Sequence, residues 1–151
     1  MIEIGKFNTL TIARDTSVGL FLTDGEHDVL LPIKYIPRRF NIGDELTVFV
    51  YLDHEERPVA TTLKPYIQLN DFAYLKVNYI NKFGAFLNWG LEKDLFVPFK
   101  EQATPMEKDK RYFVHMYMDE MTNRLVATSK TNKLFDNTEL TVTENEEVEL
   151  I

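Results

Sequence analysis

The sequence predicts an all-β protein that contains two similar small barrels in tandem. Two observations lead to this fold class. Short apolar runs are interrupted by turn residues roughly every 8–12 positions, which is the spacing of a small sandwich or barrel. The second half of the chain also repeats the first half about 65 residues later. Helical periodicity is not sustained anywhere, so a helical fold is excluded.

The repeat is clearest in one stretch of each half. Residues 17–32 read SVGLFLTDGEHDVLLP, and residues 82–98 read KFGAFLNWGLEKDLFVP. Gly19 aligns with Gly84, and the Phe-Leu pair that follows each glycine aligns as well. The offset grows by one residue at two later turns, which a tandem duplication tolerates. The halves are therefore two units of one repeat.

Each unit is expected to contain five strands. A short irregular or helical link after the third strand completes the pattern of a five-stranded OB-type barrel. The expected strands of the first unit are one that begins at Leu10 and others over 18–22, 29–31, 45–52 and 59–63; those of the second are 74–80, 85–88, 95–97, 112–118 and 125–129.

The predicted domains are 1–64, 65–135 and a final segment, 136–151. The final segment is acidic and ends on Val148-Glu149-Leu150-Ile151, which reads like the first strand of a truncated third unit. We expect further C-terminal domains of the same chain as partners, and we expect proteases to cut the linker at 64–70 or the acidic final segment.

Composition and charge limit the classes of function that fit this chain. The chain lacks cysteine and any apolar run of about 20 residues, so we expect a cytoplasmic protein without a membrane partner. The formal net charge of −7 disfavours nucleic acid as a partner. However, residues 70–130 carry nine Lys and Arg against eight Asp and Glu, whereas residues 131–151 carry one against six. The acidity is therefore concentrated outside the second unit.

Catalytic and metal-binding motifs are absent from the sequence. There is no Gly-x-Ser-x-Gly, phosphate-binding glycine loop or paired-carboxylate motif. The run Asp53-His54-Glu55-Glu56 has the composition of a metal site but the position of a hairpin tip. We therefore expect a protein that is not an enzyme, with no cofactor, no metal and no small-molecule substrate.

Several motifs of the second unit resemble the S1 RNA-binding domain. They are Phe83-Gly84-Ala85-Phe86, Asp94-Leu95-Phe96-Val97 and the stretch from Arg124 to Ser129. The resemblance covers about residues 5–130 and implies two tandem S1-like OB barrels with the start of a third. The tandem arrangement is similar to the conserved virulence factor B family of bacterial regulators. This implies a bacterial regulator of gene expression that binds single-stranded RNA, or single-stranded DNA.

The resemblance implies that Phe83, Phe86, Asp119 and Arg124 lie on the RNA-binding face. The residue types support this role, since aromatic rings stack on unpaired bases and basic side chains contact phosphates. The first unit has Val18 in place of Phe83, so the second unit is the better candidate. The candidate nucleic-acid-binding residues are Lys76, Lys82, Phe83, Phe86, Trp89, Asp119 and Arg124.

Two placements stay open from the sequence. Strict strand alternation puts Phe83 and Phe86 on opposite faces, whereas a bulge at Gly84 would turn both outward. Trp89, which precedes Gly90, would either cap the barrel or offer a surface to a base.

The fourth strands raise a further question. Their alternation places Phe49 and Tyr51, and likewise Phe113, His115 and Tyr117, opposite the aliphatic core positions. Such outward aromatic residues favour a contact between the units, with a nucleic-acid surface as the alternative. The competing function for the whole chain is a protein-interaction module that has kept the OB scaffold without affinity for nucleic acid.

Overall fold

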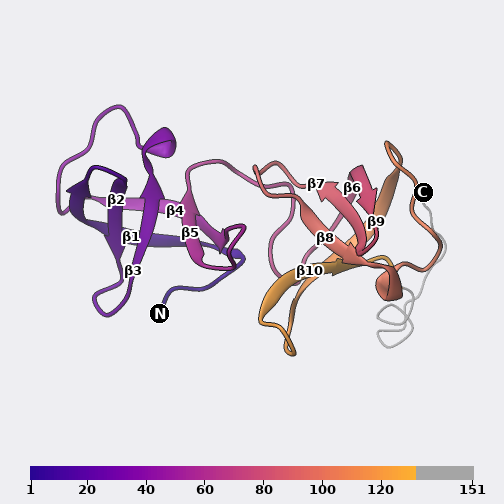
Figure 1. Cartoon of the computed structure of the whole chain (residues 1–151). Coiled ribbons are helices and arrows are strands. Elements are labelled where there is room, and N and C mark those ends of the chain that lie inside the picture. Colours follow the sequence, from indigo (N-terminus) through magenta and orange to yellow (C-terminus); the bar gives the residue numbers. More distant parts are fainter. Residues whose placement is uncertain (132–151) are drawn as a thin grey trace.

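The computed structural model describes residues 1–131, which form two closed five-stranded barrels that follow one another along the chain (Figure 1). The strands of barrel 1 are β1 (Lys6–Thr16), β2 (Gly19–Thr23), β3 (Asp28–Pro32), β4 (Glu45–Leu52) and β5 (Pro58–Thr61). Those of barrel 2 are β6 (Phe72–Asn81), β7 (Gly84–Asn88), β8 (Leu95–Pro98), β9 (Arg111–Asp119) and β10 (Arg124–Thr128). Short 3-10 turns, η1 (Ile33–Tyr35) and η2 (Phe99–Glu101), follow the third strand of each barrel.

Both barrels have the same topology. In barrel 1 the order is β1-β2-β3-β5-β4, and β4 pairs with β1 to close the sheet. All neighbours are antiparallel except β3 and β5, which are parallel through one pair, Leu30 with Val59. Barrel 2 repeats this order, and its parallel pair joins Phe96 to Val126. The predicted fold class of two tandem OB barrels is therefore confirmed.

Strand alternation builds the core of each barrel. In β4 the side chains of Val48 and Val50 are completely buried inside barrel 1, and in β9 Val114 and Met116 are completely buried inside barrel 2. Successive residues of a strand point to opposite sides, so the aromatic residues between them lie on the outer surface. Those of β4, Phe49 and Tyr51, form part of the contact between the two barrels.

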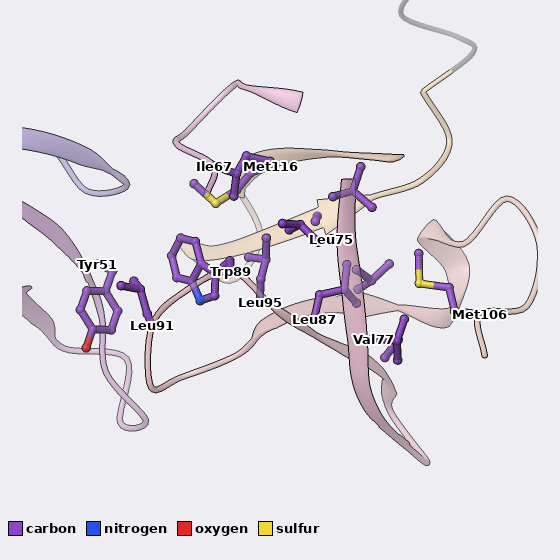
Figure 2. Close-up of a cluster of buried hydrophobic side chains, with 14 of the residues drawn as sticks. Tyr51, Ile67, Leu75, Val77, Leu87, Trp89, Leu91, Leu95, Met106 and Met116 are labelled. Atoms are coloured by element: carbon purple, nitrogen blue, oxygen red, sulfur yellow. The ribbon is translucent and has the colours of Figure 1, made fainter. Parts of the chain in front are cut away.

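The barrels contact each other through the outer face of β1 and β4 and the β7–β8 connection. Phe7, Phe49 and Tyr51 form this face of barrel 1, and we call them the docking face. Trp89 and Leu91 of barrel 2, which we call the tip, pack on it in one buried cluster (Figure 2). The contact between units that the sequence favoured is thus present for β4.

The second fourth strand does not take part in this contact through its outer face. Phe113 and His115 of β9 lie beside β6 in their own barrel, where Phe72 stacks on Phe113 and tilts against His115. Tyr117 pairs with Val126 of β10. The expectation that both fourth strands supply their outer aromatic residues to the junction is therefore wrong for β9. The junction is heterologous, since the side of one barrel contacts the end of the next.

Ion pairs and backbone hydrogen bonds surround the apolar junction. The Lys93 ammonium of barrel 2 lies 2.9 Å from both the Asp53 carbonyl oxygen and the Glu56 carboxylate of barrel 1. The Lys34 ammonium of barrel 1 pairs with the Glu92 carboxylate of barrel 2. The Lys93 contacts hold the loop before β8 to the β4–β5 hairpin, and the Lys34–Glu92 pair holds it to the η1 turn, both at the edge of the cluster.

The segment that joins the barrels is bound to both of them. The Leu69 N–H donates to the Gly5 carbonyl oxygen at 2.8 Å, and the Asn70 N–H donates to the Met116 carbonyl oxygen at 2.8 Å. The Ile67 side chain is buried in the junction. Because its backbone is held by hydrogen bonds, this segment does not have the structure of the protease-sensitive linker that the sequence suggested.

All ten predicted strands are present, with ends that differ from the predicted ones by a few residues. The domain boundaries at 64/65 and 135/136 stay predictions, and the expected first strand of a third unit lies outside the described residues. Within residues 1–131, neither of the two short 3-10 turns has the length or hydropathy of a membrane-crossing helix.

Candidate nucleic-acid interface

Three aromatic rings form a row across the outer face of barrel 2. Tyr79 of β6 stacks on Phe86 of β7 with ring centroids 4.6 Å apart and an angle of 6° between the ring planes. Phe86 in turn contacts Phe96 of β8 at 5.0 Å. We call Tyr79, Phe86 and Phe96 the aromatic row. It lies outside the barrel, since the neighbouring residues Ala85 and Leu87 are completely buried inside.

A bulge in β6 brings Tyr79 onto this row. Val77 pairs with Leu87 but Tyr79 pairs with Phe86, so Asn78 is an extra residue in the ladder. Without this extra residue, alternation from the buried Val77 would turn Tyr79 into the core. Of the two arrangements left open by the sequence, one had a bulge at Gly84; the structure has its bulge in β6, at Asn78.

The aromatic row is open at its Tyr79 end. The pairs between β6 and β9 stop at Lys76 and Arg111, three residues before Tyr79. The last part of β6 consequently pairs with β7 alone, and the Tyr79 side chain is 45% exposed. An unpaired base that stacks on Tyr79 would lengthen the row without displacing a strand.

Phe83 lies in the turn between β6 and β7 and not on a strand. The two-residue turn consists of Lys82 and Phe83, and the Asn81 carboxamide oxygen accepts a hydrogen bond from the Phe83 N–H at 2.8 Å. The Phe83 ring is 62% exposed, and the Lys82 ammonium lies 5.2 Å from its centroid. The outward orientation expected for Phe83 is therefore confirmed, and its cause is the turn.

Gly84 allows β7 and β8 to approach closely beside this turn. A Cβ atom at Gly84 would lie 2.4 Å from the Val97 carbonyl oxygen, which is much closer than nonbonded atoms approach. Gly19 of barrel 1 has the same role, because a Cβ there would lie 2.2 Å from the Leu31 carbonyl oxygen. The repeated glycine is thus a requirement of strand packing.

The basic candidates lie around the aromatic row but not all at one end of it. Lys76 of β6 is opposite Asn88 of β7 and lies 3.9 Å from the Asp109 carboxylate. Arg124 begins β10 two residues before Val126, which pairs with Phe96. It therefore lies at the Asp94 end of β8, whereas Lys82 and Phe83 lie at the Pro98 end. The structure thus separates Arg124 from Lys82.

Arg124 and Asp119 both have local partners. The Arg124 guanidinium is 3.9 Å from the Glu56 carboxylate of barrel 1. The Asp119 carboxylate accepts hydrogen bonds from the Met121 N–H at 3.1 Å and from the Thr122 hydroxyl at 3.0 Å. Asp119 therefore stabilises the β9–β10 turn, which places Arg124 opposite it in the ladder.

Trp89 is not available to a base. Its side chain is 2% exposed and forms edge contacts with Phe49 at 5.7 Å and with Tyr51 at 6.2 Å. The indole N–H donates to the Lys93 carbonyl oxygen. Since the ring is almost completely buried at the junction, it offers no surface to a base, and the expectation that Trp89 belongs to the nucleic-acid site is wrong.

The equivalent surface of barrel 1 carries different residues. Arg14 has the ladder position of Tyr79, and its guanidinium lies 4.6 Å from the Phe21 ring centroid. The same guanidinium pairs with the Asp28 carboxylate at 3.1 Å. Leu30 takes the position of Phe96. Barrel 1 therefore offers one aromatic ring that an internal ion pair already covers.

One carboxyl group beside the aromatic row has a shifted pKa. Burial raises the pKa of Asp94, while a hydrogen bond from the Asn78 carboxamide at 3.0 Å acts in the opposite direction. Asn78 is the bulged residue of β6, so this hydrogen bond connects the bulge to the start of β8. It fixes the strands that carry the row.

The sequence reasoning missed Tyr79 and Phe96. Phe96 could have been found, because it lies between Leu95 and Val97 in the same alternation that identifies core positions. Tyr79 could not be found in this way, since the bulge at Asn78 reverses the alternation. Among the described residues there is no cluster of three or more His, Asp or Glu side chains that could hold a metal ion.

Comparisons with known proteins agree with the fold. Residues 4–63 match the S1 domain family. The uncharacterized protein YitL of Bacillus subtilis (strain 168) is 35% identical over 126 residues, which are 80% of this chain and 41% of YitL. A multidomain protein with nucleic acid binding domains from Streptococcus pneumoniae superposes with a TM-score of 0.70 at 18% identity. That match covers 94% of this chain and 51% of the other.

The chain thus spans about half or less of the length of these relatives. Barrel 1 contains the segment that matches the S1 domain, and barrel 2 repeats its strand order and register. The predicted tandem of S1-like OB folds is therefore confirmed.

Proposed function

We propose that this chain is a non-enzymatic nucleic-acid-binding module that binds single-stranded RNA through the outer face of barrel 2. Two observations support a nucleic-acid partner: residues 4–63 match the S1 domain, and the chain shares its fold with the pneumococcal protein that has nucleic acid binding domains. The aromatic row Tyr79–Phe86–Phe96 is the observation that carries the proposal.

Base stacking on the aromatic row and on Phe83 supplies most of the affinity. Each base that stacks on an aromatic side chain contributes about 1–3 kcal/mol, whatever its identity. Tyr79 offers a ring at the open end of the row, and Phe83 offers a separate ring at the turn. These two rings are on the same β6–β7 hairpin, so one strand of RNA can contact both.

Phosphate contacts are few in this arrangement. Lys76 and Lys82 are the basic side chains on the hairpin, and Arg124 lies at the other end of β8. Binding that neutralises two or three phosphates has a salt dependence of about 0.7 per phosphate on a logarithmic scale. We therefore expect moderate affinity that decreases only slowly with salt.

A titration of fluorescein-labelled single-stranded RNA, followed by fluorescence anisotropy at two salt concentrations, tests the proposal. Tyr79→Ala and Phe83→Ala should each weaken binding about ten-fold, which corresponds to the loss of about 1.4 kcal/mol. Both side chains are largely outside the core, so the far-UV circular dichroism should not change.

Tyr66→Ala is the matched control. The Tyr66 ring is as exposed as that of Phe83, and it lies beside Gly90 at the opposite end of β7. Its removal should leave RNA affinity unchanged. If Tyr66→Ala weakens binding as much as Phe83→Ala does, stacking is nonspecific and the assigned surface is incorrect.

The competing function, a protein-interaction module without affinity for nucleic acid, predicts no anisotropy change at low salt. A parallel titration with single-stranded DNA of the same sequence separates a preference for RNA from general single-strand binding, because only RNA carries the 2′-hydroxyl.

The biological role that we infer is regulation of gene expression in the cytoplasm of a bacterium, of the kind the conserved virulence factor B family represents. The resemblance of the tandem S1-like units to that family supports this role. Loss of the RNA-binding surface by Tyr79→Ala in the cell should change the abundance of bound transcripts, which RNA sequencing after crosslinking would measure.

A further inference from the structure

One turn of barrel 1 contains a residue in an unfavourable backbone conformation. Glu56, between β4 and β5, has a φ of 60°, which is in the left-handed region that few residues other than glycine and asparagine adopt. Asn123 is at the equivalent place before β10 and has a φ of 58°. Each of the two directly precedes the arginine of its hairpin, Arg57 or Arg124. Since backbone strain clusters at functional sites, the Glu56 side chain is a candidate for a role beyond the turn.

The Glu56 carboxylate contacts two basic side chains of barrel 2. Its Oε2 atom accepts a hydrogen bond from the Lys93 ammonium at 2.9 Å, and its Oε1 atom is 3.9 Å from Nε of Arg124. The second distance is too long for a hydrogen bond, and Oε1 is buried without a hydrogen-bond partner. The contact between Glu56 and Arg124 is therefore a loose ion pair, which an anion with better geometry can replace.

Arg124 is accessible to an anion from solvent. Its side chain is 58% exposed, and it begins β10 beside the strand that carries Phe96 of the aromatic row. The equivalent arginine of barrel 1, Arg57, pairs with two carboxylates of its own hairpin, those of Asp53 and Glu55. Arg124 instead faces a carboxylate of the other barrel. A phosphate can accept two guanidinium N–H groups at once, which the distant Oε1 atom does not do.

We propose that the Glu56 carboxylate occupies, in the chain without RNA, the place that a backbone phosphate takes at Arg124 when RNA binds. The inference rests on the proposed function, since it concerns the regulation of the same surface of barrel 2. Both groups are anions, so the guanidinium exchanges one for the other, and RNA must displace Glu56 to gain this contact. Barrel 1 therefore lowers the affinity of barrel 2 for RNA.

The exchange at Arg124 leaves the junction between the barrels intact. The Lys93 ammonium donates to the Asp53 carbonyl oxygen as well as to Glu56, both at 2.9 Å, and neither contact involves Arg124. The apolar cluster around Trp89 lies apart from these polar groups and stays buried. Glu56 can therefore release Arg124 to a phosphate while Lys93 still holds the hairpin of barrel 1.

Glu56→Gln tests the exchange, because it removes the charge and retains an oxygen that accepts a hydrogen bond from Lys93. In the anisotropy titration with fluorescein-labelled single-stranded RNA, this variant should bind about three-fold more tightly than the unchanged chain at about 50 mM salt. The two affinities should converge at about 1 M salt, where the charges are screened. The logarithmic salt dependence should become steeper by up to about 0.7, since Arg124 then neutralises a phosphate without losing a carboxylate partner.

Glu55→Gln is the matched control, since it removes the same charge from the same turn. The Glu55 side chain is 73% exposed and pairs with Arg57 of its own barrel, so this variant should bind RNA as the unchanged chain does. In a chain that carries Arg124→Gln, Glu56→Gln should have no further effect on binding. An equal gain from Glu55→Gln, or a gain from Glu56→Gln that persists without Arg124, would overturn the proposal.

Two further results separate this proposal from its alternatives. Hydroxyl-radical footprinting of Tyr51, which is 5% exposed at the junction, should give the same oxidation with and without Glu56→Gln. More oxidation in the variant would show that Glu56 joins the barrels and would overturn the proposal. RNA binding by the unchanged chain, with an equal dissociation constant for Glu56→Gln, would overturn this inference alone. If the unchanged chain binds no RNA at about 50 mM salt, the proposed function and this inference both fail.

Discussion

Trp89 and Tyr51 should be energetically coupled across the junction between the barrels. Their rings meet edge to face with centroids 6.2 Å apart and planes at 88°. A buried aromatic side chain removes about 150–250 Å² from water, which at about 25 cal/mol per Å² is worth about 4–6 kcal/mol. Trp89→Ala should therefore lower the free energy of unfolding by about 3–5 kcal/mol, as large truncations of buried aromatic residues do.

A double-mutant cycle isolates the contact itself. Urea denaturation followed by far-UV circular dichroism would give the free energies of unfolding of Trp89→Ala, Tyr51→Ala and the double variant. The two changes should fall short of additivity by about 0.5–1.5 kcal/mol, the usual coupling of an aromatic pair. The control cycle combines Trp89→Ala with Ile12→Val, a change in the separate core of barrel 1, and should be additive within about 0.5 kcal/mol. Additivity of the Trp89–Tyr51 cycle would refute a junction held by these rings.

Three further outcomes follow from single features. Gly84→Ala should destabilise the chain by more than Gly25→Ala does in the same denaturation assay. Both glycines have a positive φ that strains any other residue, but only at Gly84 does the new Cβ also meet a backbone oxygen, the Val97 carbonyl, whereas nothing lies within 4 Å of a Cβ at Gly25. Burial lowers the pKa of His115 in the folded chain, so the unfolded chain binds the proton at a higher pH than the folded chain does. The free energy of unfolding should therefore decrease as the pH falls below about 6.5. Denaturation curves measured across that range should show a smaller decrease for His115→Gln. Limited proteolysis followed by mass spectrometry should leave the peptide bonds of 64–70 uncut, because the hydrogen bonds of Leu69 hold that segment; early cleavage there would show that the barrels separate in solution.

The strands could be predicted well because the two signals that mark them, the alternation of apolar residues and the repeated glycine, are local. Alternation in 45–52 separates Val48 and Val50 from Phe49, and the glycine of each unit marks the start of a strand that approaches its neighbour closely. The contact at Phe49 was also predictable, since outward aromatic residues in a repeated domain favour a covered surface. These inferences need no knowledge of distant parts of the chain.

The candidate site was harder to predict, because a single residue changes the direction of the side chains that follow. The extra residue at Asn78 turns Tyr79 outward, and no local sequence signal marks it. Trp89 was assigned partly to the site because its partners, Phe49 and Tyr51, are about 40 residues away and in the other barrel. The environment of Trp89 depends on packing between the two barrels, and the sequence pattern of a single barrel carries no information about that packing.

The burial of Trp89 determines what an optical experiment on this chain can report. It is the only tryptophan of the sequence, and it lies at the junction, on a different part of barrel 2 from the aromatic row. Its fluorescence is therefore an intrinsic signal of whether the barrels are joined, and a ligand that stacks on Tyr79 leaves it unquenched. When RNA binds at the aromatic row, the tryptophan emission should therefore stay constant through the titration. A red shift of the emission would instead mark separation of the two barrels.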